Sequence, residues 1–554
     1  MRTRIDEVDR ISELPDPILH HILSFLPLKQ VAWTCVLSKK WEKTWRTYPV
    51  FKIDESTLCQ YEWREPERRV KLLNYLEQTL RNHHIKGSMS MEKFSIETKL
   101  FGDIETKLFG DKEYVSFVDR CICYAIENNV KKLKLGILSK IWYEHEFGLR
   151  RASWYDLPPI VLCSNSIEVL KLRGCKLELS NVKLPSLRRL HLLEVYSNSR
   201  VINNLLVWCP LIEDIVISNC SGIASLELFG LERLNDIMIA NNKELKLVDM
   251  EKLNVSSLSV VQSSSIVQSL SFVQPLTILF VINVTFCTNL KNLRFVEAYI
   301  KDEWLCKLIS ELTLLECLEL RLCNKLKSVK ISSTSLKTFS IFRCTNVVKL
   351  EIDTHKLTHF TYDGGMMVLF CRNALALSYV DLSLSWTNLD TDWNAKFIEL
   401  LVQFHKCSVI LSLRVSKNEE FIVSKELRQM LPSPLSRCKH LNLCIKTISL
   451  LFSIAKVVDE LLWIAPHIKT LSIEYSLSDA FKKIYFEFSY KKPLVYEEEI
   501  SSCGESLPIS CWQYCIEKVK LEFNGYKGNS TKVCSLEGGE FLEKIDGLCG
   551  RLNV

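Results

Sequence analysis

Apolar residues recur along the middle of the chain in one fixed phrase around a small residue, either cysteine or asparagine. Apolar side chains stand eight, five and three positions before this anchor, and three, six and eight positions after it. With apolar residues making up 47% of the sequence, chance does not give full agreement at every position. Five anchors satisfy all six positions: Cys220, Asn242, Cys287, Cys323 and Cys344.

The half of the phrase before the anchor predicts a short strand, because its apolar residues alternate with polar ones. Cys220 and Asn242 are 22 positions apart, and Cys323 and Cys344 are 21 apart, a spacing typical of leucine-rich repeats. We therefore expect parallel strands with their apolar side chains inside. The anchor should fit into the turn after each strand, where asparagine can bond buried backbone groups and cysteine packs as a small hydrophobe.

The front half of the phrase also occurs outside the five complete copies. One of these copies ends at Cys175, which we add to the structural anchors; we predict that the anchors Cys323 and Cys344 are buried and reduced. Segments 205–212 and 461–468 each read as a short helix, a proline stop and a strand. Other front halves are Val130-Leu133-Leu135, Leu187-Leu190-Leu192, Leu357-Phe360-Tyr362 and Leu377-Val380-Leu382, and weaker ones continue from Cys407 to Glu474.

The first fifty residues have a helical pattern instead. Leu19, Ile22, Leu23 and Leu26 recur at helical spacing, and Pro27 ends that helix. Leu28 to Leu37 predicts a second short helix. Ser38 is the expected N-cap of a third helix, in which Trp41 and Trp45 share one face.

So small a helical unit has little interior, so it cannot bury all of its apolar residues. The surplus residues are Ile18, Phe25, Val31, Val36 and the two tryptophans. Leucine and tryptophan form the core of any small bundle, which is one explanation. The other is that part of this surface is a docking face for helices of another protein.

Segments 9–27 and 34–41 resemble the F-box of plant proteins, and the repeats resemble the irregular repeats of plant F-box/LRR proteins. The resemblance implies a Skp-family adaptor as partner and, through it, a cullin and a RING protein. Several of the adaptor-facing candidates must instead belong to the core, and the sequence does not separate the two groups. The candidates are Leu14, Pro15, Ile18, Leu19, Ile22, Leu23, Leu26 and Pro27.

The predicted fold is α/β: a three-helix F-box followed by an irregular leucine-rich-repeat solenoid, with parallel strands on one face and helices and loops on the other. The domains are expected at 1–50 for the F-box and 51–112 for a linker with a first strand. Repeats should occupy 113–475, and 476–554 resembles a degenerate FBD segment, with a strand over Ile516–Phe523.

Two stretches need separate explanations. The octapeptide 96–103 is repeated at once as 104–111, and we expect the extra copy to lie in a surface loop without function. Residues 254–290 carry no charge, but polar residues interrupt the run and β-branched residues are frequent. They therefore favour buried strands over a membrane span.

The composition is ordinary for a folded protein, with 25% charged residues and a net charge of +6. That charge does not call for nucleic acid or a membrane surface as partner. The start of the chain is charged rather than apolar, so the 22 cysteines are expected to be free thiols in the cytoplasm, the nucleus or both.

No catalytic motif, cofactor fingerprint or metal-ligand spacing is found in the sequence. Cys503, Cys511 and Cys515 lack paired spacing, so zinc is not predicted. His20 and His21 are expected at the surface. Lys131, Lys132 and Lys134 alternate with inward residues, which favours a solvated face over nucleic-acid binding.

The resemblance implies a non-catalytic substrate-recognition subunit of a Skp–cullin–F-box ubiquitin ligase, with an unknown protein substrate on the repeats. Two alternatives remain at this point: a non-degradative interaction scaffold, and a co-receptor for a small molecule. Adaptor binding separates the first alternative from the ligase subunit.

Overall fold

The computed structural model describes most of the chain between residues 11 and 536. The described residues are 11–54, 74, 76–81, 83, 90–99, 111–138, 141–143, 150–152, 154–178, 182–242, 244–250, 253, 255–261, 281–283, 287, 289–386, 393–405, 407–415, 428, 431–445, 454–477, 480–489, 516–524 and 532–536. They divide into two compact units, residues 1–287 and 288–554, called unit 1 and unit 2 below.

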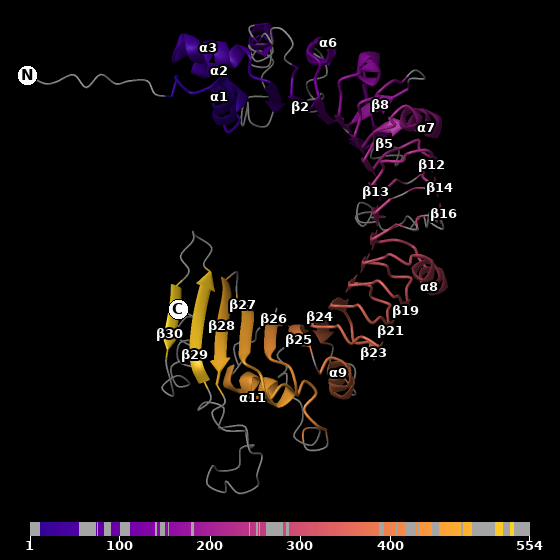
Figure 1. The fold of residues 1–554 in the computed structure, drawn as a ribbon, viewed down its shortest axis with the longest axis vertical. Coiled ribbons are helices and arrows are strands. Elements are labelled where there is room, and N and C mark those ends of the chain that lie inside the picture. The colour runs from indigo at the N-terminus through magenta and orange to yellow at the C-terminus, as the bar shows by residue number, and fades with distance from the viewer. Residues whose placement is uncertain are drawn as a thin grey trace, which may run out of the picture. The chain divides into compact units, whose positions relative to one another are not determined.

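Unit 1 begins with the F-box helices and continues as a parallel sheet (Figure 1). Each strand of this sheet pairs in parallel with the next one. The strands are β1 Val50–Asp54, β2 Lys93–Lys99, β3 Lys132–Leu138, β7 Val169–Arg173, β9 Arg189–Leu193, β11 Asp214–Ser218, β13 Asp236–Ala240 and β15 Ser257–Val261.

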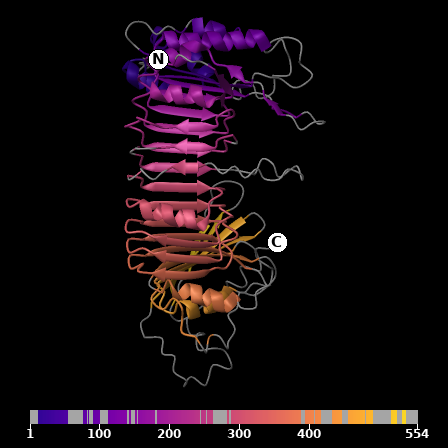
Figure 2. The same ribbon diagram turned by 90° about the vertical axis from the view of Figure 1, so that its right-hand side faces the viewer.

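Unit 2 has a parallel sheet of the same kind, extended by antiparallel strands at its C-terminal end. The parallel strands are β17 Asn292–Val296, β18 Cys317–Arg321, β20 Thr338–Phe342, β22 His359–Gly364, β24 Tyr379–Trp386, β25 Ser408–Val415, β26 His440–Ile445 and β27 Thr470–Leu477. The antiparallel ones are β28 Ala480–Phe488, β29 Ile516–Asn524 and β30 Lys532–Leu536. Figure 2 shows the parallel strands of each unit stacked one above the next.

The strands exist because their apolar residues stay in register from repeat to repeat. Ile215 pairs with Leu190 on one side and with Ile237 on the other, and all three are buried. In unit 2, Leu318 pairs with Leu293 and Phe339 in the same way. Each such side chain contributes about 1.5–3 kcal/mol by leaving water, but only while its neighbours share its register. The predicted repeat strands are confirmed.

The apolar residues after the anchor form a second, shorter layer that the sequence analysis did not assign to strands. In unit 1 this layer contains β12 Ser225–Glu227, β14 Leu247–Asp249 and β16 Val281–Asn283, which pair in parallel. Unit 2 has β19 Ser328–Ser332, β21 Lys349–Asp353 and β23 Val368–Arg372. Smaller pairings join β6 Tyr155–Asp156, β8 Cys175–Leu177 and β10 Tyr196–Ser197 in parallel, and β4 Ile141–Tyr143 with β5 Arg150–Ala152 in antiparallel fashion.

Some longer segments between consecutive main strands form a helix in place of a second-layer strand. α6 Asp111–Glu127 buries Val118, Cys121, Ile122 and Ala125, which recur at helical spacing. α7 Ser199–Val207 and α11 Ile454–Ile464 are the two predicted helices that end before a proline and lead into strands β11 and β27. The others are the 3-10 helix η3 Pro159–Cys163, α8 Asp302–Glu311 and α9 Trp393–Val402.

The main strands β7, β9, β11, β13, β17, β18 and β20 are each followed directly by a residue with left-handed backbone conformation. Asn219 and Asn241 have φ of 54° and 55°, and Gly174 has φ of 71°. The backbone N–H of Asn219 donates to the carbonyl of Ala240, 2.8 Å away, and so ties the turn to the next strand. Asparagine and glycine tolerate this conformation better than other residues.

The anchor follows this left-handed residue and closes the turn from inside. Asn242 Oδ1 accepts from the backbone N–H of Cys220 at 2.8 Å, and its Nδ2 donates to the carbonyl of Ile217 at 2.9 Å. Cys344 makes the equivalent contacts with the repeat before it. Its Sγ lies 3.3 Å from the backbone nitrogen of Cys323 and 3.8 Å from the carbonyl oxygen of Leu320. A thiol thus replaces the amide with weaker and longer bonds.

The structure buries all six predicted anchors, but Cys287 lies in a different turn. The segment before it contains β16 of the second layer, and the residues after it form β17 of the main sheet. The turn after β17 has Glu297 at φ 54° and the buried Ala298 in the anchor position. The assignment of Cys287 as a post-strand anchor is therefore wrong. The two halves of the phrase look alike, so the pattern could be assigned in either phase.

Three further expectations have partial outcomes. The first four residues of octapeptide 96–103 lie in β2, whereas residues 104–110 of the second copy lie outside the described residues. The uncharged stretch forms β15 and β16, and its residues 262–280 are outside the description. The predicted strand over Ile516–Phe523 is β29, and the cysteines at 503, 511 and 515 are not described.

In the described part of the chain, no helix has the length and apolar composition needed to cross a membrane. The cysteines of these same residues are free thiols. Burial raises the pKa of Cys175 and Cys220 to about 12, so both thiols stay protonated at neutral pH.

The anchor contacts predict a graded loss of stability at position 242. Replacing Asn242 with alanine leaves two buried backbone groups unpaired, which should lower the free energy of unfolding by about 2–4 kcal/mol. Asn242→Cys should lose clearly less, because cysteine makes the same contacts at position 344. Urea unfolding of the full chain measures both, with the exposed Asn235→Ala as control. Equal losses for alanine and cysteine would contradict the role of the side chain as a hydrogen-bond partner.

Burial also predicts which thiols react. Iodoacetamide should modify the exposed Cys163 at least about tenfold faster than Cys175 or Cys220, because alkylation needs an accessible thiolate. Peptide mass spectrometry of the native protein over time gives the rates. Rapid labelling of Cys220 in the folded chain would show that its turn opens freely.

Candidate functional site

The first candidate site is the helical cluster at the start of unit 1. It consists of α1 Asp16–Leu23, α2 Leu28–Trp33, the 3-10 helix η1 Thr34–Val36, and α3 Lys39–Arg46. Pro17 lies in the first turn of α1, where its missing N–H costs nothing. Ser38 caps α3 as predicted, since its Oγ accepts from the backbone N–H of Trp41 at 3.3 Å.

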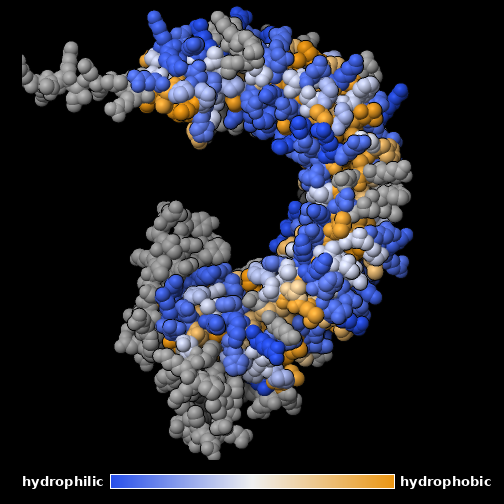
Figure 3. Space-filling model, viewed as in Figure 1, coloured by the Kyte–Doolittle hydropathy of each residue, from blue (hydrophilic) through white to orange (hydrophobic). Residues whose placement is uncertain are grey.

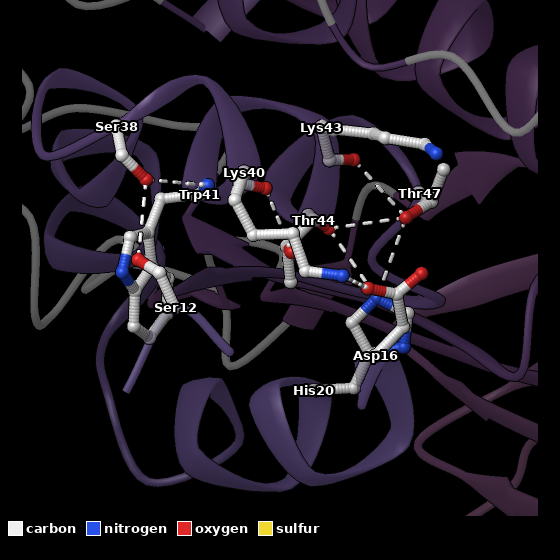
Figure 4. Close-up of polar contacts among 9 residues, drawn as sticks. All are labelled: Ser12, Asp16, His20, Ser38, Lys40, Trp41, Lys43, Thr44 and Thr47. Carbon is white, nitrogen blue, oxygen red and sulfur yellow. Dashed lines mark hydrogen bonds and ion pairs between the residues drawn. The ribbon is translucent and has the colours of Figure 1, made fainter. Parts of the chain in front are cut away.

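Polar contacts fix α1 against α3 (Figure 4). Lys40 forms an ion pair with Asp16, and this hydrogen bond lowers the pKa of the Asp16 carboxyl. The Nε2 atom of His20 lies 3.3 Å from the carbonyl oxygen of Thr44, to which the ring N–H can donate. His20 is half-buried, and burial lowers its pKa. The expectation that His20 is a surface group is therefore wrong, whereas His21 is exposed.

The apolar residues of these helices divide into buried and exposed sets. Leu19, Leu23, Val31, Trp41 and Trp45 are buried. Of the residues expected to exceed the interior of the helical unit, Val31 and the two tryptophans Trp41 and Trp45 are thus buried rather than exposed. The exposed set lies mainly in or beside α1, α2 and η1, and Figure 3 shows hydrophobic surface over this end of unit 1. It comprises Ile11, Ile18, Phe25, Trp33, Val36 and Leu37, with Phe25 at 74% and Val36 at 83% exposure.

Trp45 is buried because the repeats supply the interior that the helices lack. Its ring lies 5.1 Å from that of His83 and 6.4 Å from that of Phe51 on β1. His83 is fully buried, and its Nε2 lies 2.7 Å from the carbonyl oxygen of Tyr48. Phe51 in turn stacks on Phe94 of β2. The helical cluster and the first strands of the sheet therefore share one core.

The eight sequence candidates for adaptor contact separate along the same division. Leu19 and Leu23 belong to the core. Pro15, Ile18 and Pro27 are exposed, while Leu14, Ile22 and Leu26 are half-buried. Phe25 and Val36 were expected to be surplus apolar residues of the helical unit but were not among the candidates for adaptor contact. Trp33 and Leu37 were in neither group. These residues fall outside the helical spacing of the core residues and so lie on the opposite face. That position was the signal that could have identified them.

The second candidate site is the outer face of the main sheet. Alternate residues of each strand point away from the core, and those of β3 and β7 include Lys132, Lys134 and Lys171. Parallel strands of equal length set these residues in straight rows about 4.8 Å apart from strand to strand. A surface of this kind can bind an extended partner but holds no catalytic constellation. Among the described residues, no three His, Cys, Asp or Glu side chains converge as metal ligands.

Comparison with known proteins gives two family models. Residues 11–53 match the F-box domain. Residues 91–281 and 263–482 each match the model described as the At1g61320/AtMIF1 LRR domain. The helical module and the repeat sheets thus define a class of protein that joins an F-box to leucine-rich repeats. The chain belongs to the family of F-box/LRR-repeat proteins.

Relatives from Arabidopsis thaliana agree with this assignment. F-box/LRR-repeat protein At3g59200 is 30% identical over 219 residues, which are 38% of this chain and 37% of the relative. F-box/LRR-repeat protein At4g14103 is 30% identical over 41% of this chain and 55% of its own length. F-box/FBD/LRR-repeat protein At2g04230 is 28% identical over 39% and 43%, respectively. The match thus covers about half or less of the length of these relatives.

Trp33 and Trp45 of the cluster should have opposite effects on stability when truncated. Trp45→Ala removes a ring from the shared core and should lower the free energy of unfolding by about 3–5 kcal/mol. Trp33→Ala removes a ring that is 57% exposed and should change it by less than about 1 kcal/mol. Urea unfolding of both variants tests the division. A large loss for Trp33→Ala would place that ring in the core.

Proposed function

We propose that this protein is the substrate-recognition subunit of a Skp–cullin–F-box ubiquitin ligase. In this role, the F-box binds a Skp-family adaptor, which links it to a cullin and a RING protein, and the repeats bind the substrate. The observation that carries the proposal is the exposed apolar set on the F-box helices. Large apolar side chains that stay exposed together are typical of a protein–protein interface.

The geometry of the F-box suits an adaptor made of helices. Phe25 follows α1, Trp33 ends α2, and Val36 lies in η1, so the exposed side chains come from consecutive short elements. The buried residues of α1 and α2 are a separate set: Leu19, Leu23, Leu28 and Val31. Docking on the exposed set therefore removes apolar surface from water without disturbing the core. At about 25 cal/mol per Å² of buried apolar surface, such residues can dominate the affinity.

The chain itself supplies no chemistry in this proposal. Catalysis would follow from proximity, because the complex holds a substrate lysine close to a charged conjugating enzyme on the RING protein. The role of the repeats is to hold one substrate in a fixed position relative to the adaptor. The shared core of Trp45, His83 and Phe51 supports this role, since it joins the adaptor-binding helices rigidly to the first strands.

Adaptor capture tests the proposal. The double variant Phe25→Ala/Val36→Ala should bind a purified Skp-family adaptor at least about tenfold more weakly, since each truncation of an interface anchor costs about 1 kcal/mol or more. The variant Leu14→Ala/Pro15→Ala tests the candidates from the sequence. Titration calorimetry with the full chain measures the affinity, and thermal unfolding checks that each variant is folded.

The matched control is Val348→Ala/Leu375→Ala in unit 2, where both side chains are also exposed. This control should bind the adaptor as the unchanged protein does. A chain that is folded but binds no Skp-family adaptor is not a ligase subunit. Unchanged affinity in both F-box variants would move the interface to another surface.

A further inference from the structure

One row of side chains crosses the outer face of the unit 1 sheet from β1 to β13. The strand register makes each residue the neighbour of the next. Lysines dominate the first part of the row, and apolar residues end it. In order, the row is Lys52, Ser95, Lys134, Lys171, His191, Val216 and Met238.

The adjacent row also has cations in its first part, but it ends in acidic residues. Lys93 pairs with Lys132, and further along Arg189 pairs with Asp214 and then Asp236. Over the strands from β1 to β9, seven cations whose side chains are described occupy outward positions against one described acidic residue, Glu97. Cations therefore outnumber acidic residues on this face more strongly than in the whole chain, which has 71 lysines and arginines and 65 acidic residues. The seven are Lys52, Lys93, Lys132, Lys134, Lys171, Arg173 and Arg189.

Only part of this charge is neutralised within the protein. Lys132 pairs with Glu92, Lys134 with Glu97, and Arg173 with Glu194, all in exposed ion pairs. The other four cations form no ion pair with another described residue. They are Lys52, Lys93, Lys171 and Arg189.

The lysines of this face repel one another. Burial lowers the pKa of Lys93, and the charges of Lys52, Lys134, Lys132 and Lys171 lower it further. Like charges held this close destabilise the protonated lysine. An anion placed on the face would remove that repulsion, so the surface favours a negatively charged partner.

We propose that this face, deepening the ligase function proposed above, binds an acidic segment of the substrate protein. The segment would lie extended across the strands. Its carboxylates would contact Lys52, Lys93 and Lys171, and an apolar side chain next to the acidic run would pack on Val216 and Met238. The seven strands from β1 to β13 span about 29 Å, which corresponds to about nine extended residues.

The end of the row favours a peptide over a nucleic acid. Met238 is 37% exposed, and Asp214 and Asp236 stand beside the apolar end. Their carboxylates would repel a phosphate backbone that continued along the sheet, whereas a peptide can change from acidic to apolar residues at this point. The rows also lack the aromatic side chains on which unpaired bases stack.

The test uses the full chain bound to its adaptor and fluorescein-labelled peptides of about nine residues, the length that spans the row. One peptide carries glutamates followed by a leucine, a second has the reverse order, and a third has glutamines in place of the glutamates. Fluorescence anisotropy measures binding. The glutamate peptide in one of the two orders should bind, and the glutamine peptide should bind at least about tenfold more weakly.

Variants assign the binding to this face. Lys93→Glu/Lys171→Glu should weaken binding of the glutamate peptide at least about tenfold, since two cations change sign. The matched control Lys246→Glu/Lys330→Glu changes two exposed lysines of the second strand layers and should have little effect. Met238→Ala should weaken binding of the peptide that contains leucine but should not weaken binding of a peptide made of glutamates alone. Relief of repulsion predicts that Lys93→Gln leaves the thermal midpoint unchanged or raises it.

Three outcomes would overturn the proposal: equal binding of the glutamate and glutamine peptides, equal effects of the two double variants, or a single-stranded oligonucleotide of the same charge binding as tightly as the peptide. The last result would indicate a general polyanion surface. Adaptor affinity of Lys93→Glu/Lys171→Glu should be unchanged. Loss of peptide binding with adaptor binding intact in that variant therefore separates this proposal from the ligase function itself.

Discussion

The repeats from β7 to β13 and from β17 to β20 depend on the turn that ends each main strand. A residue with left-handed backbone, such as Asn219 or Asn241, donates its N–H to the next strand, and the following anchor bonds the strand before it. These contacts fix the register between neighbouring strands. A slip by one residue would turn every inward leucine to solvent and every outward lysine to the core. The straight rows of side chains on the outer face are a direct consequence of this constraint.

The F-box shows how a small helical unit can have both a core and an interface. About forty residues cannot bury Trp45 and still leave Phe25 and Val36 for a partner unless another element supplies interior. Here β1 and β2 supply it through Phe51 and Phe94, and His83 joins them. The repeats therefore support the F-box physically, and the exposed residues of α1, α2 and η1 remain available for binding.

The sequence predicted the repeat strands well, because burial imposes a strict spacing on each of them. It also predicted the N-cap Ser38, since capping is local chemistry. It could not place Trp45 or His20, whose burial depends on distant residues. It also assigned Cys287 to the wrong turn, because the phrase is almost symmetric about its anchor. The residue before an anchor does not resolve the phase either, because Leu322 and Arg343 adopt left-handed backbone before Cys323 and Cys344.

The rows on the sheet face illustrate a different limit. The spacing of Lys132 and Lys134 predicted that both point outward, but Lys93 and Lys171 are far from them in sequence and become neighbours only through strand pairing. A pattern confined to one strand looked like an ordinary solvated face. Charge that gathers across strands is a property of the fold, and it appears only when the register is known.

The central claim is that the F-box binds an adaptor while the sheet face stays free for a substrate. Hydrogen-exchange mass spectrometry of the full chain, with and without a purified Skp-family adaptor, tests this separation most directly. The account predicts that the adaptor slows amide exchange within residues 11–37 and leaves β3, β7 and β9 unchanged. Slower exchange over those strands, or no change in the F-box helices, would contradict it.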